Sequence, residues 1–181
     1  MTDLPSLRET LDAHGLSAKK SFGQHFLMDL NVTRKIVRLA GPFEGRAVIE
    51  VGPGPGGLTR ALLESEAGKV VLVEKDPRFI PLLTELDDGS GRLAIVEADA
   101  LKVREADLVQ GPAHLVSNLP YNVGTALLIK WLTGPWLPHA LTLMFQKEVA
   151  ERVVAAPGDE AYGRLAVISQ AVCTARIVMH L

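Results

Sequence analysis

A glycine-rich turn between a short apolar strand and a helix constrains the fold of this chain more than any other feature. Residues 47–51 (Ala-Val-Ile-Glu-Val) predict a buried strand, residues 52–57 (Gly-Pro-Gly-Pro-Gly-Gly) a tight turn, and residues 58–64 a helix. This order opens a nucleotide-binding βαβ unit. Glycine suits the turn because it reaches positive φ without strain and, lacking Cβ, lets a ligand lie against the backbone at the helix N-terminus.

The turn favours an adenosine-containing ligand without phosphates. Gly52, Gly54 and Gly57 satisfy G-x-G-x-x-G, which does not by itself distinguish a dinucleotide from another adenosine cofactor. A pyrophosphate is held by successive backbone N–H groups, and Pro53 and Pro55 remove two of these donors. S-adenosylmethionine has no phosphate, and E-x-G-x-G-x-G after the first strand is usual in its methyltransferases. The alternative is a glycine-rich turn that binds nothing.

Composition narrows the class of protein. At 181 residues and 48% hydrophobic, the chain can bury one substantial core, so we expect one domain. The five histidines show no ligand spacing and predict no metal site, and no segment is long enough to span a bilayer. The single cysteine, Cys173, lies in an apolar run and is expected to be buried. We therefore expect a cytoplasmic protein without membrane contact.

Strand and helix patterns alternate after the glycine turn, which predicts an α/β fold with a mostly parallel, doubly wound sheet. The expected helices are residues 6–14, a helix that begins at Asp29 or Asn31 and ends at Gly41, and residues 77–86, 125–132, 146–154 and 164–172. The further strands are expected at residues 69–73, 93–96, 114–117, 141–145 and 176–181.

Two acids follow neighbouring strands and are candidate contacts of an adenosine cofactor. Glu74 ends the second strand about twenty residues past the first glycine, where ribose hydroxyls are held. Asp99 follows the third strand and could accept a hydrogen bond from the adenine amine. Alternatively, Glu74 could be a surface acid that pairs with Lys75. Asp99 could be the N-cap of a helix.

The segment Asn118-Leu-Pro-Tyr121 follows the fourth strand and suits a planar base that carries an amine. The Asn118 side-chain oxygen and the Leu119 or Pro120 carbonyl can accept from the exocyclic NH₂, which directs the nitrogen lone pair toward an incoming methyl group. Tyr121 can stack on the ring. The alternative is an ordinary turn sequence.

The net charge of the whole chain and the local charge of residues 17–46 indicate different things about nucleic-acid binding. The net charge of −2 and pI near 6.2 lack the global basic signature of a nucleic-acid-binding protein. Residues 17–46 nevertheless carry six basic residues against two acidic ones, a local net of +4. These cations could follow a phosphate backbone or form a solvated face. They are Lys19, Lys20, Arg34, Lys35, Arg38 and Arg46, with Lys147 and Arg152 expected near the same rim.

Several motifs in order show that the chain resembles the ribosomal RNA adenine N6,N6-dimethyltransferases of the KsgA type. They are residues 21–27 (Ser-Phe-Gly-Gln-His-Phe-Leu), 50–57, 118–121, 145–150 (Phe-Gln-Lys-Glu-Val-Ala) and 162–165 (Tyr-Gly-Arg-Leu). The resemblance implies a Rossmann-like, S-adenosylmethionine-dependent methyltransferase fold. Residues 1–46 would form N-terminal helices and a basic loop that covers the cofactor, in the same domain as a core of residues 47–181.

The resemblance also assigns site residues. The implied cofactor-binding set is Gln24, His25, Leu27, Gly52, Gly54, Glu74, Lys75, Asp99, Ala100 and Asn118. The implied catalytic set is Asn118, Leu119, Pro120 and Tyr121, and the RNA-binding candidates are Lys19, Lys20, Lys147 and Arg152. The family often has Asn where His25 stands.

The family's target is a pair of adjacent adenosines in a hairpin near the 3′ end of small-subunit rRNA, each dimethylated, in the immature small ribosomal subunit. Members continue into a seventh, antiparallel strand and a small basic helical domain, so the chain looks like a truncated catalytic domain, expected to be monomeric. Residues 176–181 should then expose an unpaired strand edge or pair with another molecule.

Three alternatives stay open. One is a large-subunit rRNA adenine methyltransferase of the antibiotic-resistance type, which shares the Asn-Leu-Pro-Tyr form. Another is a ribosome-assembly or transcription factor that keeps the fold and binds nucleic acid without catalysis. The third, an NAD-dependent oxidoreductase, needs a catalytic acid or base for hydride transfer that the sequence does not show.

Overall fold

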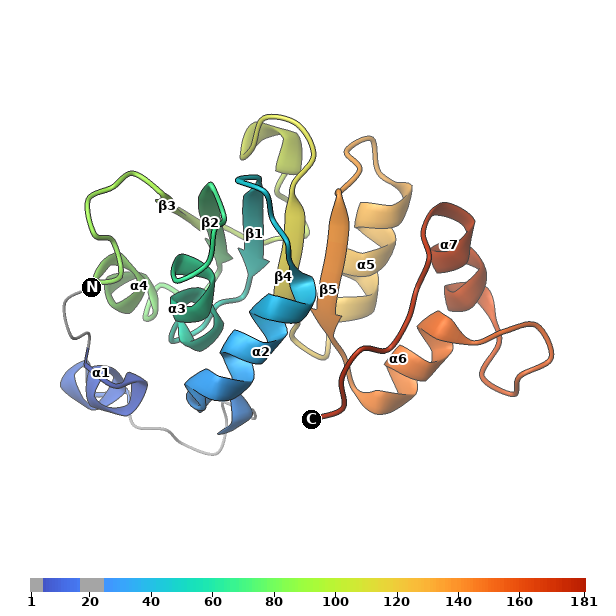
Figure 1. The fold of residues 1–181 in the computed structure, drawn as a ribbon, viewed down its shortest axis with the longest axis horizontal. Coiled ribbons are helices and arrows are strands. Elements are labelled where there is room, and N and C mark those ends of the chain that lie inside the picture. The colour runs from blue at the N-terminus through green and yellow to red at the C-terminus, as the bar shows by residue number, and fades with distance from the viewer. Residues whose placement is uncertain (1–4, 17–24) are drawn as a thin grey trace.

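A computed structural model describes residues 5–16 and 25–181, in which a five-stranded parallel sheet forms the centre (Figure 1). The sheet has the order β3-β2-β1-β4-β5, which confirms the predicted parallel α/β architecture. Its strands are β1 (Ala47–Val51), β2 (Lys69–Glu74), β3 (Leu93–Glu97), β4 (His114–Asn118) and β5 (Ala140–Met144). The chain reverses its direction of travel across the sheet between β1 and β4, which is where open α/β sheets bind ligands.

The helices lie close to their predicted positions. They are α1 (Leu7–Ala13), η2 (His25–Met28), α2 (Leu30–Ala40), α3 (Gly57–Leu63), α4 (Ile80–Thr84), η3 (Glu105–Asp107), α5 (Gly124–Thr133), α6 (Lys147–Val154) and α7 (Arg164–Val172). Asp29, not Asn31, caps α2, because its carboxylate accepts from the Asn31 N–H at 2.8 Å. No helix in the described ranges is long and apolar enough to cross a membrane.

Alternate residues of the central strands face two separate hydrophobic layers. Val48, Val70 and Leu72 pack with α2 and α3 on one face of the sheet. Ile49 and Val71 pack with α5 on the other. Figure 1 shows α2 and α3 in front of the strands and α5 behind them. Burial on both faces explains why these strands are nearly continuous apolar runs.

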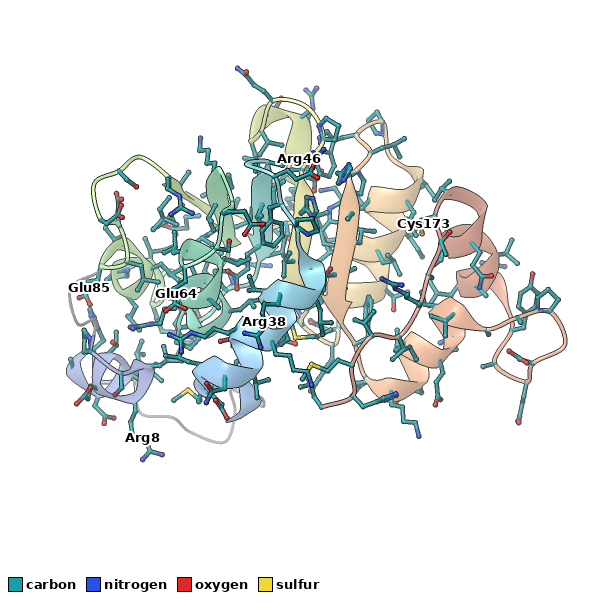
Figure 2. All side chains as sticks on the ribbon, in the orientation of Figure 1. Arg8, Arg38, Arg46, Glu64, Glu85 and Cys173 are labelled. Atoms are coloured by element: carbon teal, nitrogen blue, oxygen red, sulfur yellow. The ribbon has the colours of Figure 1, made fainter. Side chains whose placement is uncertain are left out.

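The elements before β1 are fastened to α3. Arg60 of α3 donates to the Pro5 carbonyl at 2.8 Å and to the Thr10 hydroxyl at 3.0 Å, which holds α1 against the sheet's helical layer. Arg34 of α2 pairs through two hydrogen bonds of 2.6 and 2.8 Å with Glu64. Figure 2 labels Glu64 at the end of α3.

The prediction of a strand at residues 176–181 is wrong, and so is the unpaired edge expected there. Residues 173–181 contain no strand and pair with none of the five strands, so they lack the hydrogen bonds to a neighbouring strand that would make them one. Met179 instead packs against the layer that contains α2, near which the segment ends (Figure 1). Cys173 is exposed after α7, contrary to the expected burial, and lies 2.9 Å from the Ser169 carbonyl (Figure 2).

Candidate functional site

The predicted site residues meet at the carboxyl edge of the sheet. Glu74 and Asn118 end β2 and β4, and Gly52 follows β1 directly. Val51 pairs with Val73 in the register, so the glycine turn and Glu74 leave the sheet at the same level. Because all five strands are parallel, these side chains converge on one rim.

The glycine turn has the left-handed backbone that its composition predicts. The φ angles of Gly52, Gly54 and Gly56 are +66°, +54° and +87°. Gly56 also caps the N-terminus of α3, and a Cβ there would lie 3.0 Å from Leu86 Cδ1. The sequence motif places its glycines at 52, 54 and 57, and so passes over Gly56, although the run of four glycines in six residues signals it.

Glu74 is tied to the glycine turn and not to Lys75. Its Oε2 accepts from the Gly54 N–H at 3.0 Å, and its Oε1 accepts from the Asp76 N–H at 2.8 Å. The carboxylate thus occupies an N–H that a pyrophosphate would need, and its charge repels an anion. Each oxygen keeps a second lone pair that can accept from a hydroxyl group. The arrangement favours a ligand with a free diol and no phosphate.

Asp99 is the first residue of a tight turn. The helix N-cap that the sequence offered as an alternative is not what the structure has at this position. The Lys102 N–H donates to the Asp99 carbonyl at 2.8 Å, and the Leu101 N–H donates to Oδ1 at 3.1 Å. Asp99 Oδ2 pairs with Lys75 Nζ at 3.0 Å, and this hydrogen bond holds the pKa of Asp99 below its usual value. Lys75 and Asp99, both candidate cofactor contacts, therefore touch each other, with Ala100 in the turn.

Glu50 lies beneath this rim, in a buried position that favours its neutral form. It is 2% exposed, and its Oε2 accepts from the Thr59 hydroxyl at 2.7 Å. Burial raises the pKa of Glu50 to about 8, against the opposing effect of Thr59 and with a smaller contribution from the Glu74 charge. The sequence signals this site by an acid that interrupts an apolar strand.

Asn118 presents a free amide at the junction of β1 and β4. It is 9% exposed, and within the described ranges its side chain makes no hydrogen bond. The Ser117 hydroxyl donates to the Val51 carbonyl at 2.5 Å, which fastens the end of β4 to β1. A Cβ on Gly52 would lie 3.6 Å from Pro120 Cγ, so the glycine turn lies against the segment that follows Asn118.

The two backbone acceptors that the sequence left open are not equivalent. The Pro120 carbonyl accepts from the Val123 and Gly124 N–H groups at 3.2 and 3.0 Å, at the start of α5. The Leu119 side chain is 2% exposed and belongs to the core. Of these two carbonyls, that of Pro120 is used by α5, and that of Leu119 is therefore the one left to accept from a ligand.

A depression lies next to Asn118, between residues 119–121 and the start of α6. Tyr121, which is 63% exposed, lines it together with Phe145 and Gln146. A Cβ on Gly124 would lie 3.1 Å from Phe145 Cε1, so the close approach of this ring depends on a glycine at the start of α5. Phe145 is absent from the site residues predicted above, although its place as an aromatic residue directly after β5 signals it.

The remaining candidates lie outside the described residues, against α3 or on the surface. Lys19, Lys20 and Gln24 fall outside the described ranges, and of His25 only its backbone in η2 is described. The Leu27 carbonyl lies against α3, 2.2 Å from where a Gly57 Cβ would be. Lys147 and Arg152 are exposed on α6. In the basic stretch, Arg34 is paired with Glu64 and Arg46 with Glu44.

Comparison with known proteins shows the family to which this chain belongs. The family model described as "Ribosomal RNA adenine dimethylase" matches residues 15–181. Ribosomal RNA small subunit methyltransferase A of Phenylobacterium zucineum is 70% identical over 177 residues, which are 97% of this chain and 62% of that protein. Its counterpart in Caulobacter vibrioides is 69% identical over 91% of this chain and 64% of its own length. The chain thus spans less than two thirds of these relatives.

Solved structures agree on the fold. A dimethyladenosine transferase from Plasmodium falciparum superposes with a TM-score of 0.68 and 32% identity over 78% of this chain and 50% of its own. The 23S rRNA methyltransferase ErmE has a TM-score of 0.60 and 30% identity over 70% of this chain and 50% of its own. The Rossmann-like methyltransferase fold expected from the sequence is confirmed.

Proposed function

The chain belongs to the ribosomal RNA adenine dimethylase family, and from this premise we propose that it transfers methyl groups from S-adenosylmethionine to the N6 amines of two adjacent adenosines in the 3′-terminal hairpin of small-subunit rRNA. The observation that carries the proposal is the free amide of Asn118, between the glycine turn and the aromatic depression. The proposed partner is the immature small ribosomal subunit in the cytoplasm, bound by a monomer.

The charge and the hydrogen-bond acceptors of the rim suit S-adenosylmethionine. Gly52 and Gly54 would lie along its backbone, Glu74 would accept from the ribose hydroxyls, and Asp99 with Ala100 would meet the adenine. Lys75, Gln24, His25 and Leu27 complete the proposed cofactor contacts. The cofactor supplies an electrophilic methyl group on a positively charged sulfur. No phosphate has to be placed at the Gly54 N–H that Glu74 occupies.

The residues of this chain would prepare the amine for attack. Asn118 Oδ1 and the Leu119 carbonyl would accept its two N–H groups, which turns the nitrogen lone pair out of conjugation with the ring. Tyr121 and Phe145 would hold the base between them, since both line the same depression. The amine becomes cationic when it is methylated and then releases its proton to water, so no strong general base is required.

RNA would reach the depression along exposed cations. Lys147 follows Gln146 directly, and its Nζ lies 3.7 Å from Glu151, a weak exposed pair. Arg152 lies on the same helix, α6. Lys19 and Lys20 are proposed to extend this contact. The target adenosines lie in a loop, where unstacked bases can enter a pocket.

Transfer from radiolabelled S-adenosylmethionine to an RNA hairpin with two adjacent loop adenosines tests the proposal. A large-subunit rRNA fragment and a hairpin with guanosines at the two positions serve as matched substrates. We expect label in N6,N6-dimethyladenosine from the first hairpin alone. Preferential labelling of the large-subunit fragment would overturn the proposed substrate, and cofactor binding without transfer to any RNA would overturn the proposed activity.

A further inference from the structure

We propose that Lys130 is a positioning residue for the turn that carries Asp99 and Ala100. The inference rests on the proposed function, because it assigns to Lys130 the task of shaping the adenine contact of the cofactor site. Lys130 lies on α5, outside the glycine turn and outside the Asn118 segment. It acts on the cofactor only through the backbone of residues 99–103.

The ammonium group of Lys130 has three acceptors for its three protons. It donates to the Ala100 carbonyl at 2.8 Å, to the Val103 carbonyl at 2.5 Å and to Glu105 Oε1 at 2.6 Å. Its side chain is 25% exposed and that of Glu105 is 9% exposed. A fully coordinated ammonium in this setting holds its partners more firmly than an exposed lysine would.

Of the two carbonyls, that of Ala100 lies within the turn of residues 99–102 and that of Val103 follows the turn directly. This turn closes through Lys102 N–H to the Asp99 carbonyl, and its first side chain is fixed by the Leu101 N–H. Lys130 therefore holds the turn through its backbone carbonyls, whereas Lys75 holds it through the Asp99 carboxylate. Without this contact, neither carbonyl has a side-chain donor within the described ranges. The hydrogen bonds that remain on the turn are its internal ones and the one from Lys75, beside the packing of Ala100 and Val103 on the core.

Glu105 and Trp131 lock the lysine in place. Trp131, 1% exposed, donates from Nε1 to the same Glu105 oxygen at 2.8 Å. The sequence marks Lys130 as the only charged residue in the helix Gly124–Thr133. Placing the Lys130 charge in an apolar helix costs desolvation free energy that a hydrophobic residue would avoid. We therefore infer that the contacts of Lys130 serve a role other than stability.

The same helix carries the catalytic segment at its other end. The Pro120 carbonyl accepts the first N–H groups of α5, so the position of Asn118-Leu-Pro-Tyr121 is coupled to that of the helix. Lys130 lies nearly two turns further along α5 and holds the Asp99 turn. One rigid helix thereby sets the spacing between the adenine contact and the target-amine contact.

Calorimetric titration of the 181-residue chain with S-adenosylmethionine tests the inference. Lys130→Met should weaken binding roughly tenfold, by analogy with the loss that follows when a residue that orients a metal ligand is removed. Lys130→Arg keeps donors for the carbonyls and should recover most of this loss. Leu132→Ala, a matched control, empties a core position on the same helix that does not contact the turn. It should lower the melting temperature and leave the dissociation constant unchanged.

Hydrogen exchange gives a second readout that does not need the cofactor. The Leu101 and Lys102 amides should exchange faster in Lys130→Met than in Leu132→Ala, at a temperature where both are folded. Equal exchange and equal affinity in Lys130→Met and the unsubstituted chain would overturn the inference. If the unsubstituted chain binds no S-adenosylmethionine, the proposed cofactor is wrong, and the exchange rates still decide whether Lys130 holds the turn.

Discussion

The Glu74 carboxylate accepts a hydrogen bond from the Gly54 N–H at 3.0 Å, which joins the end of β2 to the turn after β1. The acid therefore shapes the glycine turn before any ligand is present. A ribose diol would use the lone pairs that this bond leaves free. Recognition of the cofactor and the conformation of the turn thus depend on one carboxylate.

Replacing Glu74 with alanine should weaken S-adenosylmethionine binding. The loss removes a charged hydrogen bond to the ribose, worth about 1.5–3 kcal/mol, or roughly ten- to a hundredfold in the dissociation constant. Glu97 pairs with Glu74 in the sheet register and is exposed, so Glu97→Ala is the matched control for charge. Titration calorimetry measures both variants. An affinity for Glu74→Ala equal to that of Glu97→Ala would remove Glu74 from the site.

Asn118→Ala should reduce methyl transfer on the order of a hundredfold, the cost of removing one preorganised polar group from a reacting centre. Cofactor binding should weaken much less, since one neutral hydrogen bond is worth about 1 kcal/mol. Asn122→Ala changes an exposed amide of the same segment and should leave transfer intact. Single-turnover labelling of the RNA hairpin gives the rates. Turnover by Asn118→Ala at the rate of Asn122→Ala would exclude the proposed acceptor role.

Gly57→Ala should disturb the contact between η2 and α3. The new Cβ would lie 2.2 Å from the Leu27 carbonyl oxygen, so the backbone must move, at a cost of about 1–3 kcal/mol in unfolding free energy. Affinity for S-adenosylmethionine should fall as well, because Leu27 is a proposed cofactor contact. Gly163→Ala, at the start of α7, places its Cβ in open space with extended φ and serves as the control. Urea unfolding that fails to separate the two variants would count against the close approach.

Most of the fold could be predicted because its signals are local. The glycine turn, the Asp29 cap and the apolar runs of the strands each depend on residues a few positions apart. The segment of residues 176–181 could not be predicted this way. It has strand composition, but whether it forms a strand depends on a neighbouring edge, which is a tertiary property.

The site shows the same division. Glu74, Asp99 and Asn118 could be proposed from their places after strands, since parallel topology brings strand ends together. The pairing of Lys75 with Asp99 and the contact of Lys130 with the Ala100 carbonyl join residues 24 and 30 positions apart. No periodicity reports such contacts, which are set by how α5 and the 99–103 segment pack on the sheet.

The buried Glu50 carboxyl predicts a fall in stability as pH rises. Its pKa is raised by burial from 4.5 to about 8, so between these values the unfolded chain has released a proton that the folded chain retains. The contribution is fully present below pH 4.5 and is lost by about pH 8, a loss on the order of 3–5 kcal/mol.

Glu50→Gln isolates this effect, because the amide still offers Thr59 an acceptor and does not ionise. In urea unfolding at pH 5, 6.5 and 8, the unfolding free energy of Glu50→Gln should rise relative to that of the unsubstituted chain as pH rises. For Glu97→Gln, which replaces an exposed acid, the difference from the unsubstituted chain should stay the same. A constant difference between Glu50→Gln and the unsubstituted chain over this range would mean that Glu50 is ionised in the folded state. Its negative charge would then lie beside Glu74 at the floor of the cofactor rim and would favour a cationic ligand there.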